Sequence, residues 1–325
     1  MPIVLSPVVV APSPVPGLVG VAVTTGRYRR RIAEETGNFV ASTVSAASTT
    51  FLQDLRYPVR SSLDQADLYT GKWLLRPHAT DERDRTRVVQ ERGYDPGTGV
   101  LRPDSPWFTT PVTDEPYELH GVIEPWEQML DLINEALKRC FVVDHLVLPI
   151  SPGVSFVNLT PYAPWLLDRR WVRGARFVDP NAYDDPTDID MSTPTFRGYV
   201  DQQGRAMVLR WQNTPWQAEQ VLVVRCIRRC YDYCRTGPDG VFGEISGLSK
   251  EEHECVAAED WVAAAAMVDF WDTFGNVVAA GNRQEAETNQ QKWAETFTTI
   301  TQGYFTLPPY TLLAPVKSGW GAGWY

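Results

Sequence analysis

The apolar positions between Glu118 and Cys140 repeat with the period of an α-helix. Apolar side chains stand at i, i+3, i+4, i+7, i+10, i+11 and i+14, at Trp126, Met129, Leu130, Ile133, Ala136, Leu137 and Cys140. This spacing gives one continuous apolar stripe on a helix. Pro125 suits the first turn, where a missing N–H costs nothing. The pattern therefore predicts a helix of about 14 residues that packs through one face.

Upstream of this segment, the pattern predicts a short helix followed by β structure. Residues 27–41 have helical periodicity and open with a cluster of arginines at Arg27, Arg29, Arg30 and Arg31. Such a charged run most often faces solvent, and contact with a partner is the alternative. Residues 42–67 are rich in Ser, Thr and Asp and predict a loop with short strands. Residues 68–112 predict two strands joined by a turn at 95–99, because DPGTG favours a tight turn.

Downstream of Cys140, the chain predicts β structure. Runs of apolar and β-branched residues mark six candidate strands at 141–148, 154–159, 171–179, 196–200, 205–211 and 221–233. For the end of the last run, a helix is the alternative. Residues 202–204, Gln-Gln-Gly, predict a hairpin loop between the fourth and fifth strands.

The last third of the chain returns to helical patterns. Ser249 and Glu252 have the spacing of a capping box, which predicts a helix from there to about Ala280. The expected buried positions of this helix are Trp261, Ala265, Val268 and Trp271. A second helix is predicted over residues 284–303, with an apolar side formed by Trp293, Phe297, Ile300 and Tyr304.

Both ends of the chain combine apolar side chains with prolines that prevent regular structure. Residues 1–20 contain five prolines, so an extended arm that lies on a partner is one interpretation and a disordered terminus is the other. Residues 305–325 contain three more prolines. This second segment carries the aromatic candidates for partner binding, Tyr310, Trp320, Trp324 and Tyr325. Aromatic side chains enter partner pockets with few rotors to freeze.

Composition narrows the class of protein. The 325 residues suggest roughly two domains, and 43% hydrophobic residues can bury a substantial core. The net charge of −10 argues against tight coating of a nucleic acid or of an anionic membrane surface. An odd number of cysteines, five, does not suggest a disulfide framework and fits a reducing compartment. We expect no signal peptide, and the apolar run 261–271 is too short to span a bilayer.

A search for chemistry finds no catalytic signature. The four histidines, His78, His120, His145 and His253, lack short ligand spacing and are expected to be structural. Cys226, Cys230 and Cys234 are spaced by four and would share a face, so three thiolates of a zinc site are possible, but buried small side chains are the favoured interpretation. The Asp-rich segment 179–190 suits either a cation or solvent. We expect no catalytic residue, bound metal or cofactor.

The order of the segments is more informative than any single motif. A basic first helix is followed by YDPGTG at 94–99, by PYELHGVIEP, by INEAL at 133–137, by the β segment EQVLVVRCIRRC, and by the helix 257–271. This order resembles the head-to-tail adaptor (connector) proteins of tailed bacteriophages, the group that includes tail tubular protein A. The resemblance covers about residues 26–303. The Pro-rich arm and the aromatic tail depart from it.

The resemblance implies an α+β fold with a helical adaptor domain, a β-rich sandwich or barrel-like region, and extended arms. The corresponding boundaries are 1–25 for the N-terminal arm, 26–115 for the short helix and hairpin region, 116–303 for the core, and 304–325 for the C-terminal arm. Besides the four aromatic residues of the tail, Arg29 and Arg30 are the expected partner-binding residues.

The resemblance also implies a structural virion protein that catalyses no reaction. Such a protein forms a homo-oligomeric ring, commonly a dodecamer, under the portal protein and joins the capsid to the next tail or neck component. DNA passes through its lumen during genome ejection without specific binding, and an acidic lumen suits that passage. The expected location is the neck of the virion after assembly in the host cytoplasm, with no membrane contact. The alternatives are another tail or baseplate structural protein, or an unrecognised cytoplasmic enzyme with a metal in the Asp-rich segment.

Overall fold

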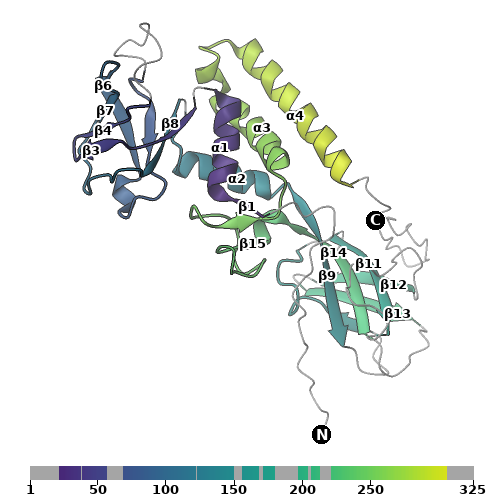
Figure 1. The fold of residues 1–325 in the computed structure, drawn as a ribbon. Helices are drawn as coiled ribbons and strands as arrows, with labels where there is room; N and C mark the ends of the chain where they lie inside the picture. The colour runs from purple at the N-terminus through teal and green to yellow at the C-terminus, as the bar shows by residue number, and fades with distance from the viewer. Residues whose placement is uncertain are drawn as a thin grey trace.

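A computed structural model describes residues 22–305, except residues 38, 57–68, 122, 150–155, 168–170, 180–196, 204–205 and 213–220. The fold is α+β, with the described α-helices gathered in one part of the molecule together with a small antiparallel sheet, and the larger antiparallel sheets in two other parts. Three bodies follow one another along its length (Figure 1), which we call the N-terminal sheet, the helical centre and the β insertion. The helical centre lies between the other two.

The N-terminal sheet has the strand order β2-β8-β5-β6-β7-β4-β3. Its strands are β2 Val40–Thr43, β3 Ala46–Ser48, β4 Phe51–Gln53, β5 Trp73–Leu75, β6 Thr86–Asp95, β7 Val100–Pro103 and β8 Pro116–His120. Only two residues separate β2 from β3 in the chain, so the two edges of the sheet meet and the sheet curls around its own core. The predicted DPGTG turn joins β6 to β7. The boundary expected between residues 115 and 116 falls inside this sheet.

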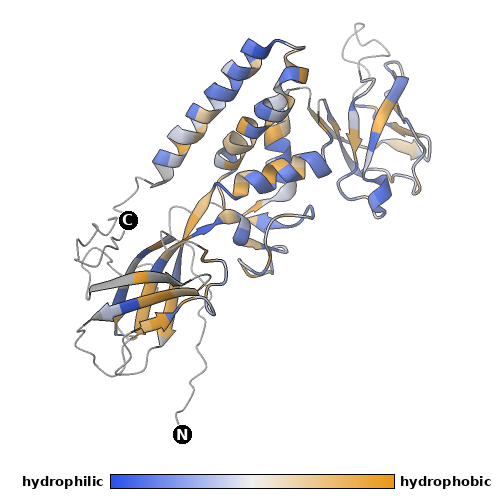
Figure 2. Cartoon of the chain, turned by 180° about the vertical axis from the view of Figure 1, so that it is seen from behind, coloured by the Kyte–Doolittle hydropathy of each residue, from blue (hydrophilic) through white to orange (hydrophobic). Residues whose placement is uncertain are grey.

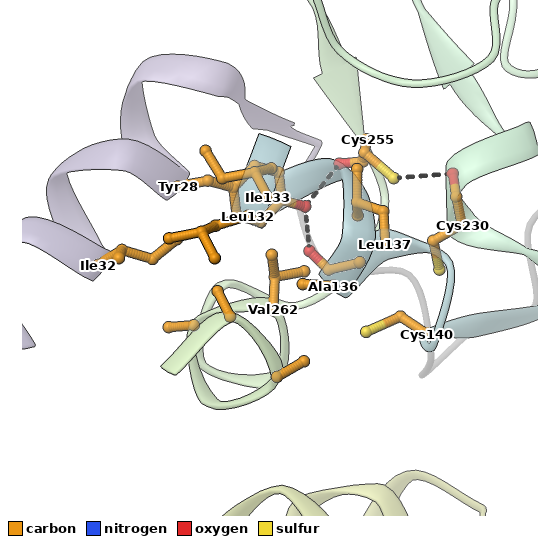
Figure 3. Close-up of a cluster of buried hydrophobic side chains, with 14 of the residues drawn as sticks. Tyr28, Ile32, Leu132, Ile133, Ala136, Leu137, Cys140, Cys230, Cys255 and Val262 are labelled. Atoms are coloured by element: carbon orange, nitrogen blue, oxygen red, sulfur yellow. Dashed lines mark hydrogen bonds between the residues drawn. The ribbon is translucent and has the colours of Figure 1, made fainter. Parts of the chain in front are cut away.

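The helical centre combines segments from across the chain. Its helices are α1 Thr25–Thr36, α2 Glu127–Leu137, α3 Glu259–Val278 and α4 Arg283–Phe305, with the 3-10 helix η4 Cys230–Asp232. Its small sheet has the order β1-β16-β15, made of β1 Val23–Thr24, β16 Glu254–Cys255 and β15 Cys234–Arg235. Side chains of α1, α2 and α3 meet in its core (Figure 3). In Figure 2, α3 is apolar over much of its length, whereas α4 is mostly polar.

The β insertion spans residues 141–229 and consists of two three-stranded antiparallel sheets, β11-β14-β9 and β10-β13-β12. Its strands are β9 Phe141–Pro149, β10 Phe156–Asn158, β11 Val172–Val178, β12 Arg197–Gln203, β13 Ala206–Gln212 and β14 Val221–Arg229. The paired strands β9 and β14 join it to the helical centre, in register from Phe141↔Arg229 to Pro149↔Val221. Each of the six predicted strands overlaps an observed strand, and β12 pairs with β13 as expected. The last strand ends at Arg229 and is followed by η4, and Gln202 and Gln203, expected in the hairpin loop, belong to β12.

Three predicted helix boundaries are wrong. The first helix ends at Thr36 instead of Ala41, because Gly37 adopts φ 76° and Ala41 belongs to β2. The helix α2 is 11 residues long instead of about 14, because it ends at Leu137 and Cys140 already leads into β9. The carboxylate of Glu124 accepts hydrogen bonds from the backbone N–H groups of Trp126 (3.0 Å) and Gln128 (3.2 Å), which fixes the helix start there.

The third wrong boundary is the expected capping box at Ser249. The helix α3 begins ten residues later, at Glu259, because Glu254 and Cys255 are drawn into β16 between two partner strands. The N–H of Ser249 donates instead to Nδ1 of His253 (3.2 Å). The helix α4 closely matches its prediction.

Burial confirms most of the predicted apolar stripes. In α2, Met129, Ile133, Ala136 and Leu137 are buried, as is Cys140 just beyond the helix. Leu130 and Trp126 are half-buried, while Leu132, outside the stripe, is buried. In α3, Trp261 and Ala265 are buried, but Val268 and Trp271 are half-buried. Trp293, Phe297 and Ile300 of α4 pack on the same core; the side chain of Tyr304 lies outside the described residues.

The helices α3 and α4 approach closely at Gly275. A Cβ atom at that position would lie 2.9 Å from Cβ of Ala286. Small residues at this crossing let the two backbones come together, and Trp261 Nε1 donates to Oγ1 of Thr301 (2.8 Å) further along the pair. This helical hairpin is therefore built by close packing rather than by charge.

Candidate functional site

The arginine cluster of α1 is the part of the predicted site that the structure describes. Arg29 extends into the molecule and meets two carboxylates from distant segments. Its Nη2 and Nε donate to Oε1 and Oε2 of Glu118 in β8, at 3.0 and 3.1 Å. Its Nη1 donates to Oε2 of Glu251, before β16, at 2.6 Å. The guanidinium thus joins the helical centre to the N-terminal sheet.

Glu118 is the centre of this network. Arg30 Nε donates to its Oε1 at 2.7 Å, and His120 Nε2 lies 2.9 Å from its Oε2. Glu118 is fully buried, and Arg29 is 1% exposed. Two arginines therefore face two carboxylates, Glu118 and Glu251, which balances the charge of the cluster. A buried carboxylate needs such partners, because an unpaired charge away from water is very costly.

The electrostatics of the cluster favour the ionised pair. Burial acts to raise the pKa of Glu118, but the hydrogen bond from His120 and the charge of Arg29 outweigh it and hold that pKa well below its usual range. Burial opposes the charge of Arg29, but Glu118 and Glu251 raise its pKa above the ordinary value. Burial lowers the pKa of His120. These directions favour the charged forms of Glu118 and Arg29 in the folded chain.

The outer arginines of α1 bind the start of α3. Arg27 Nε contacts Glu259 at 2.5 Å, and Arg31 Nε contacts Asp260 at 3.0 Å. Both carboxylates lie in the first turn of α3, where negative charge also suits the helix dipole. The four arginines therefore hold α1 to three other segments of the same chain.

This arrangement corrects the prediction for Arg29. Its side chain is neither on a solvated face nor exposed to a partner, because it is buried and fully engaged inside the chain. Arg30 keeps 44% of its side chain exposed and stays a candidate for partner binding. The other four candidates, Tyr310, Trp320, Trp324 and Tyr325, lie outside the described residues.

The carboxylate partners were missed at the sequence level. Glu118 stands beside Tyr117 and Leu119 in β8, and all three are buried. A strand buried on both sides has no alternation of polar and apolar positions that would single out Glu118. Its partner Arg29 lies 89 positions away, so no local spacing links the two residues.

The histidines with described partners have structural contacts. His120 binds Glu118, Arg225 Nε donates to His145 Nε2 at 3.2 Å, and His253 accepts from Ser249. His78 is exposed. Within the described ranges, no group of three or more His, Cys, Asp or Glu side chains is arranged to hold a metal ion.

The three cysteines of the 226–234 segment are all buried, as favoured from the sequence, but they do not share a face of one element. Cys226 lies in β14 and packs in the β insertion. Cys230 and Cys234 lie beyond the break at η4 and pack in the helical centre. Of the Asp-rich segment only Asp179 is described, and it is exposed; the remainder lies outside the described residues.

Each of three motifs that carry the resemblance contains a polar residue that makes a contact within the fold. In YDPGTG, the carboxylate of Asp95 accepts from the N–H of Gly97 (2.9 Å) and from Oγ1 of Thr98 (2.6 Å), which closes the turn. In INEAL, the side-chain amide of Asn134 donates to the carbonyl of Leu248 (2.9 Å) and accepts from its N–H (2.8 Å). In PYELH, Glu118 holds the arginine cluster.

Comparison with models of protein families, with curated proteins and with solved structures found no match for this chain. Along the described residues, no helix has both the length and the apolar composition needed to cross a membrane.

Proposed function

We propose that the chain is a structural virion protein, a head-to-tail adaptor that forms a ring beneath the portal of a tailed bacteriophage. The ring joins the capsid to the tail and lines the channel through which DNA leaves. The observation that carries the proposal is the order of the adaptor-like segments along the chain, together with the structural role of a polar residue in each. Asp95, Glu118 and Asn134 each close a contact that shapes the fold.

The distribution of charge supports a structural role over a chemical one. The buried charged groups around Arg29 are paired with one another inside the chain. In the β insertion, Arg228 Nη1 pairs with the buried Asp144 at 3.4 Å. The guanidinium carbon of Arg228 also lies 4.9 and 5.1 Å from the ring centroids of Trp165 and Tyr233. Each buried charge of this kind depends on its partner inside the chain, because an unpaired buried charge is costly.

The shape and charge of the chain suit a ring subunit. Three bodies in line give a long molecule with a large lateral surface for copies of itself. The net charge of −10 suits a channel wall, since negative charge repels the DNA phosphates and does not hold them. The aromatic tail and Arg30 are the proposed contacts with the portal and with neighbouring subunits.

The proposal is tested with purified full-length protein and purified portal rings of the same phage. Native mass measurement of the mixture, followed by sedimentation, gives the mass of the assembly and the fraction of chain bound. We expect the chain to sediment with the portal as a closed homo-oligomer. A chain that stays monomeric in the presence of portal and does not sediment with it would overturn the proposal. Arg30→Gln tests the proposed contact between the exposed side chain of Arg30 and the portal or a neighbouring subunit.

A further inference from the structure

Four of the five cysteines lie close together in the helical centre, away from the arginine cluster. Cys140 follows α2, Cys230 lies in η4, Cys234 in β15 and Cys255 in β16. All four side chains are fully buried and reduced in the structure. Figure 3 shows Cys255 directed at the main chain of Cys230, with Cys140 nearby.

Two of these thiols converge on one oxygen atom. Sγ of Cys234 lies 3.3 Å from the carbonyl oxygen of Cys230, and Sγ of Cys255 lies 3.4 Å from the same oxygen. The two sulfurs therefore both lie against the same carbonyl group. Cys234 and Cys255 are also directly opposite each other in the antiparallel pair β15–β16.

Opposite residues in an antiparallel pair of strands are either hydrogen-bonded or non-hydrogen-bonded, and the backbone hydrogen bonds around Cys234 and Cys255 show which type this pair is. The N–H of Thr25 donates to the carbonyl of His253 (2.9 Å), so alternation along β16 turns the backbone groups of Cys255 toward β1. The carbonyl of Cys234 accepts from the N–H of Gly243 (2.9 Å), on the side away from β16. Cys234 and Cys255 thus form a non-hydrogen-bonded pair, whose Cα atoms are about 4.5 Å apart in antiparallel sheets.

That separation lies within the range that a disulfide spans, about 4.4 to 6.8 Å between Cα atoms. We propose that Cys234 and Cys255 are an oxidation site and form a cross-strand disulfide when the protein meets a peroxide. Hydrogen peroxide oxidises one thiol to a sulfenic acid and releases one water. The second thiol displaces the sulfenic oxygen as another water, so two S–H bonds are replaced by one S–S bond.

Peroxide reaches the buried cysteine pair when the segments around it open. The strands β15 and β16 are two residues long, and residues 236–253 between them form an excursion without a helix. Much of this excursion is exposed to solvent, and an exposed segment with few buried contacts opens at lower cost than the core helices do. The disulfide closes this loop and holds β15 to β16. Tyr28 Oη of α1 donates to Cys255 O in β16 at 3.5 Å and to Ala257 O just after it at 2.5 Å. This inference stands independently of the proposed function.

The test uses the full chain, first reduced and then treated with hydrogen peroxide under native conditions. Remaining thiols are alkylated and the chain is digested with trypsin, which gives the peptides 230–235 and 251–283. We expect these two peptides to be linked after peroxide and separate after dithiothreitol. Fragmentation between the two cysteines of 230–235 assigns the link to Cys234 or to Cys230 without any variant.

Variants and heat give a second readout. We expect oxidation to raise the melting temperature of the wild type by about 5 °C, because the crosslink restricts the unfolded chain. Cys234→Ala should lose both the link and the shift, whereas Cys226→Ala, at an equally buried cysteine in β14, should keep both. A link assigned to Cys230, the absence of any link, or a melting temperature that dithiothreitol does not change would overturn the proposal.

Discussion

Replacing Arg29 with Met tests whether the buried ion pair of Arg29 with Glu118 holds the helical centre to the N-terminal sheet. The side chain is 2% exposed and its partner Glu118 is fully buried, so the substitution removes one member of a desolvated pair. Breaking such a pair costs about 3–5 kcal/mol, because the remaining charge stays buried. Glu118 retains Arg30 and His120, which places the expected loss near the lower limit, at about 3 kcal/mol.

The assay is urea unfolding followed by circular dichroism at 222 nm, which reports mainly on the four long helices. The free energy of unfolding falls by about 1–3 kcal/mol for each molar of urea, so a loss of about 3 kcal/mol lowers the urea midpoint by about 1 M or more. The matched control is Arg27→Met, on the same helix. Its side chain is 64% exposed, and an exposed pair of this kind contributes at most about 1 kcal/mol.

A double-mutant cycle with Glu118→Leu separates the pair from the packing of each side chain. The double variant should lose less stability than the sum of the two single variants, with a coupling of about 1–3 kcal/mol. The reasoning is refuted if Arg29→Met keeps native helix content and unfolds within about 0.5 kcal/mol of Arg27→Met.

Three further predictions follow. The pKa of Glu118 is lower in the folded chain than its ordinary value of 4.5, so ionised Glu118 stabilises the fold above pH 4.5, and this stabilisation is lost as the pH falls below 4.5. The difference in melting temperature between wild type and Glu118→Gln should therefore shrink below pH 4.5 and stay constant above it. Ile133→Ala, at 1% exposure, should cost about 2–5 kcal/mol in chemical unfolding, and the half-buried Leu130→Ala less than about 2 kcal/mol; equal losses would contradict the assigned helix face. Removing residues 306–325 should leave circular dichroism unchanged but abolish sedimentation with portal rings, whereas unfolding would place the tail in the core.

Local signals were sufficient where a few neighbouring residues determine the backbone. The turn between β6 and β7 forms as predicted, because Asp95 bonds to Gly97 and Thr98 within the turn itself. The strand β9 was predicted to within one residue at its end. Its run of apolar residues is typical of a strand buried in the middle of a protein.

Local signals failed where distant residues decide the structure. The spacing of Ser249 and Glu252 is that of a capping box, yet the following residues pair with β1, more than 200 positions earlier in the chain. A short helical preference is outweighed by strand pairing that also buries Cys255. The interior direction of Arg29 was equally hidden, because its two carboxylates are 89 and 222 positions away.

The proposed place of the chain in the neck of a tailed phage particle can be observed by electron microscopy. Particles of the phage that encodes the chain are labelled with gold-conjugated antibody against residues 283–305. The helix α4 is a suitable epitope, because much of its polar face is exposed. Our account predicts gold at the junction of head and tail on most particles. Gold at the far end of the tail, or particles that lack the chain, would contradict it.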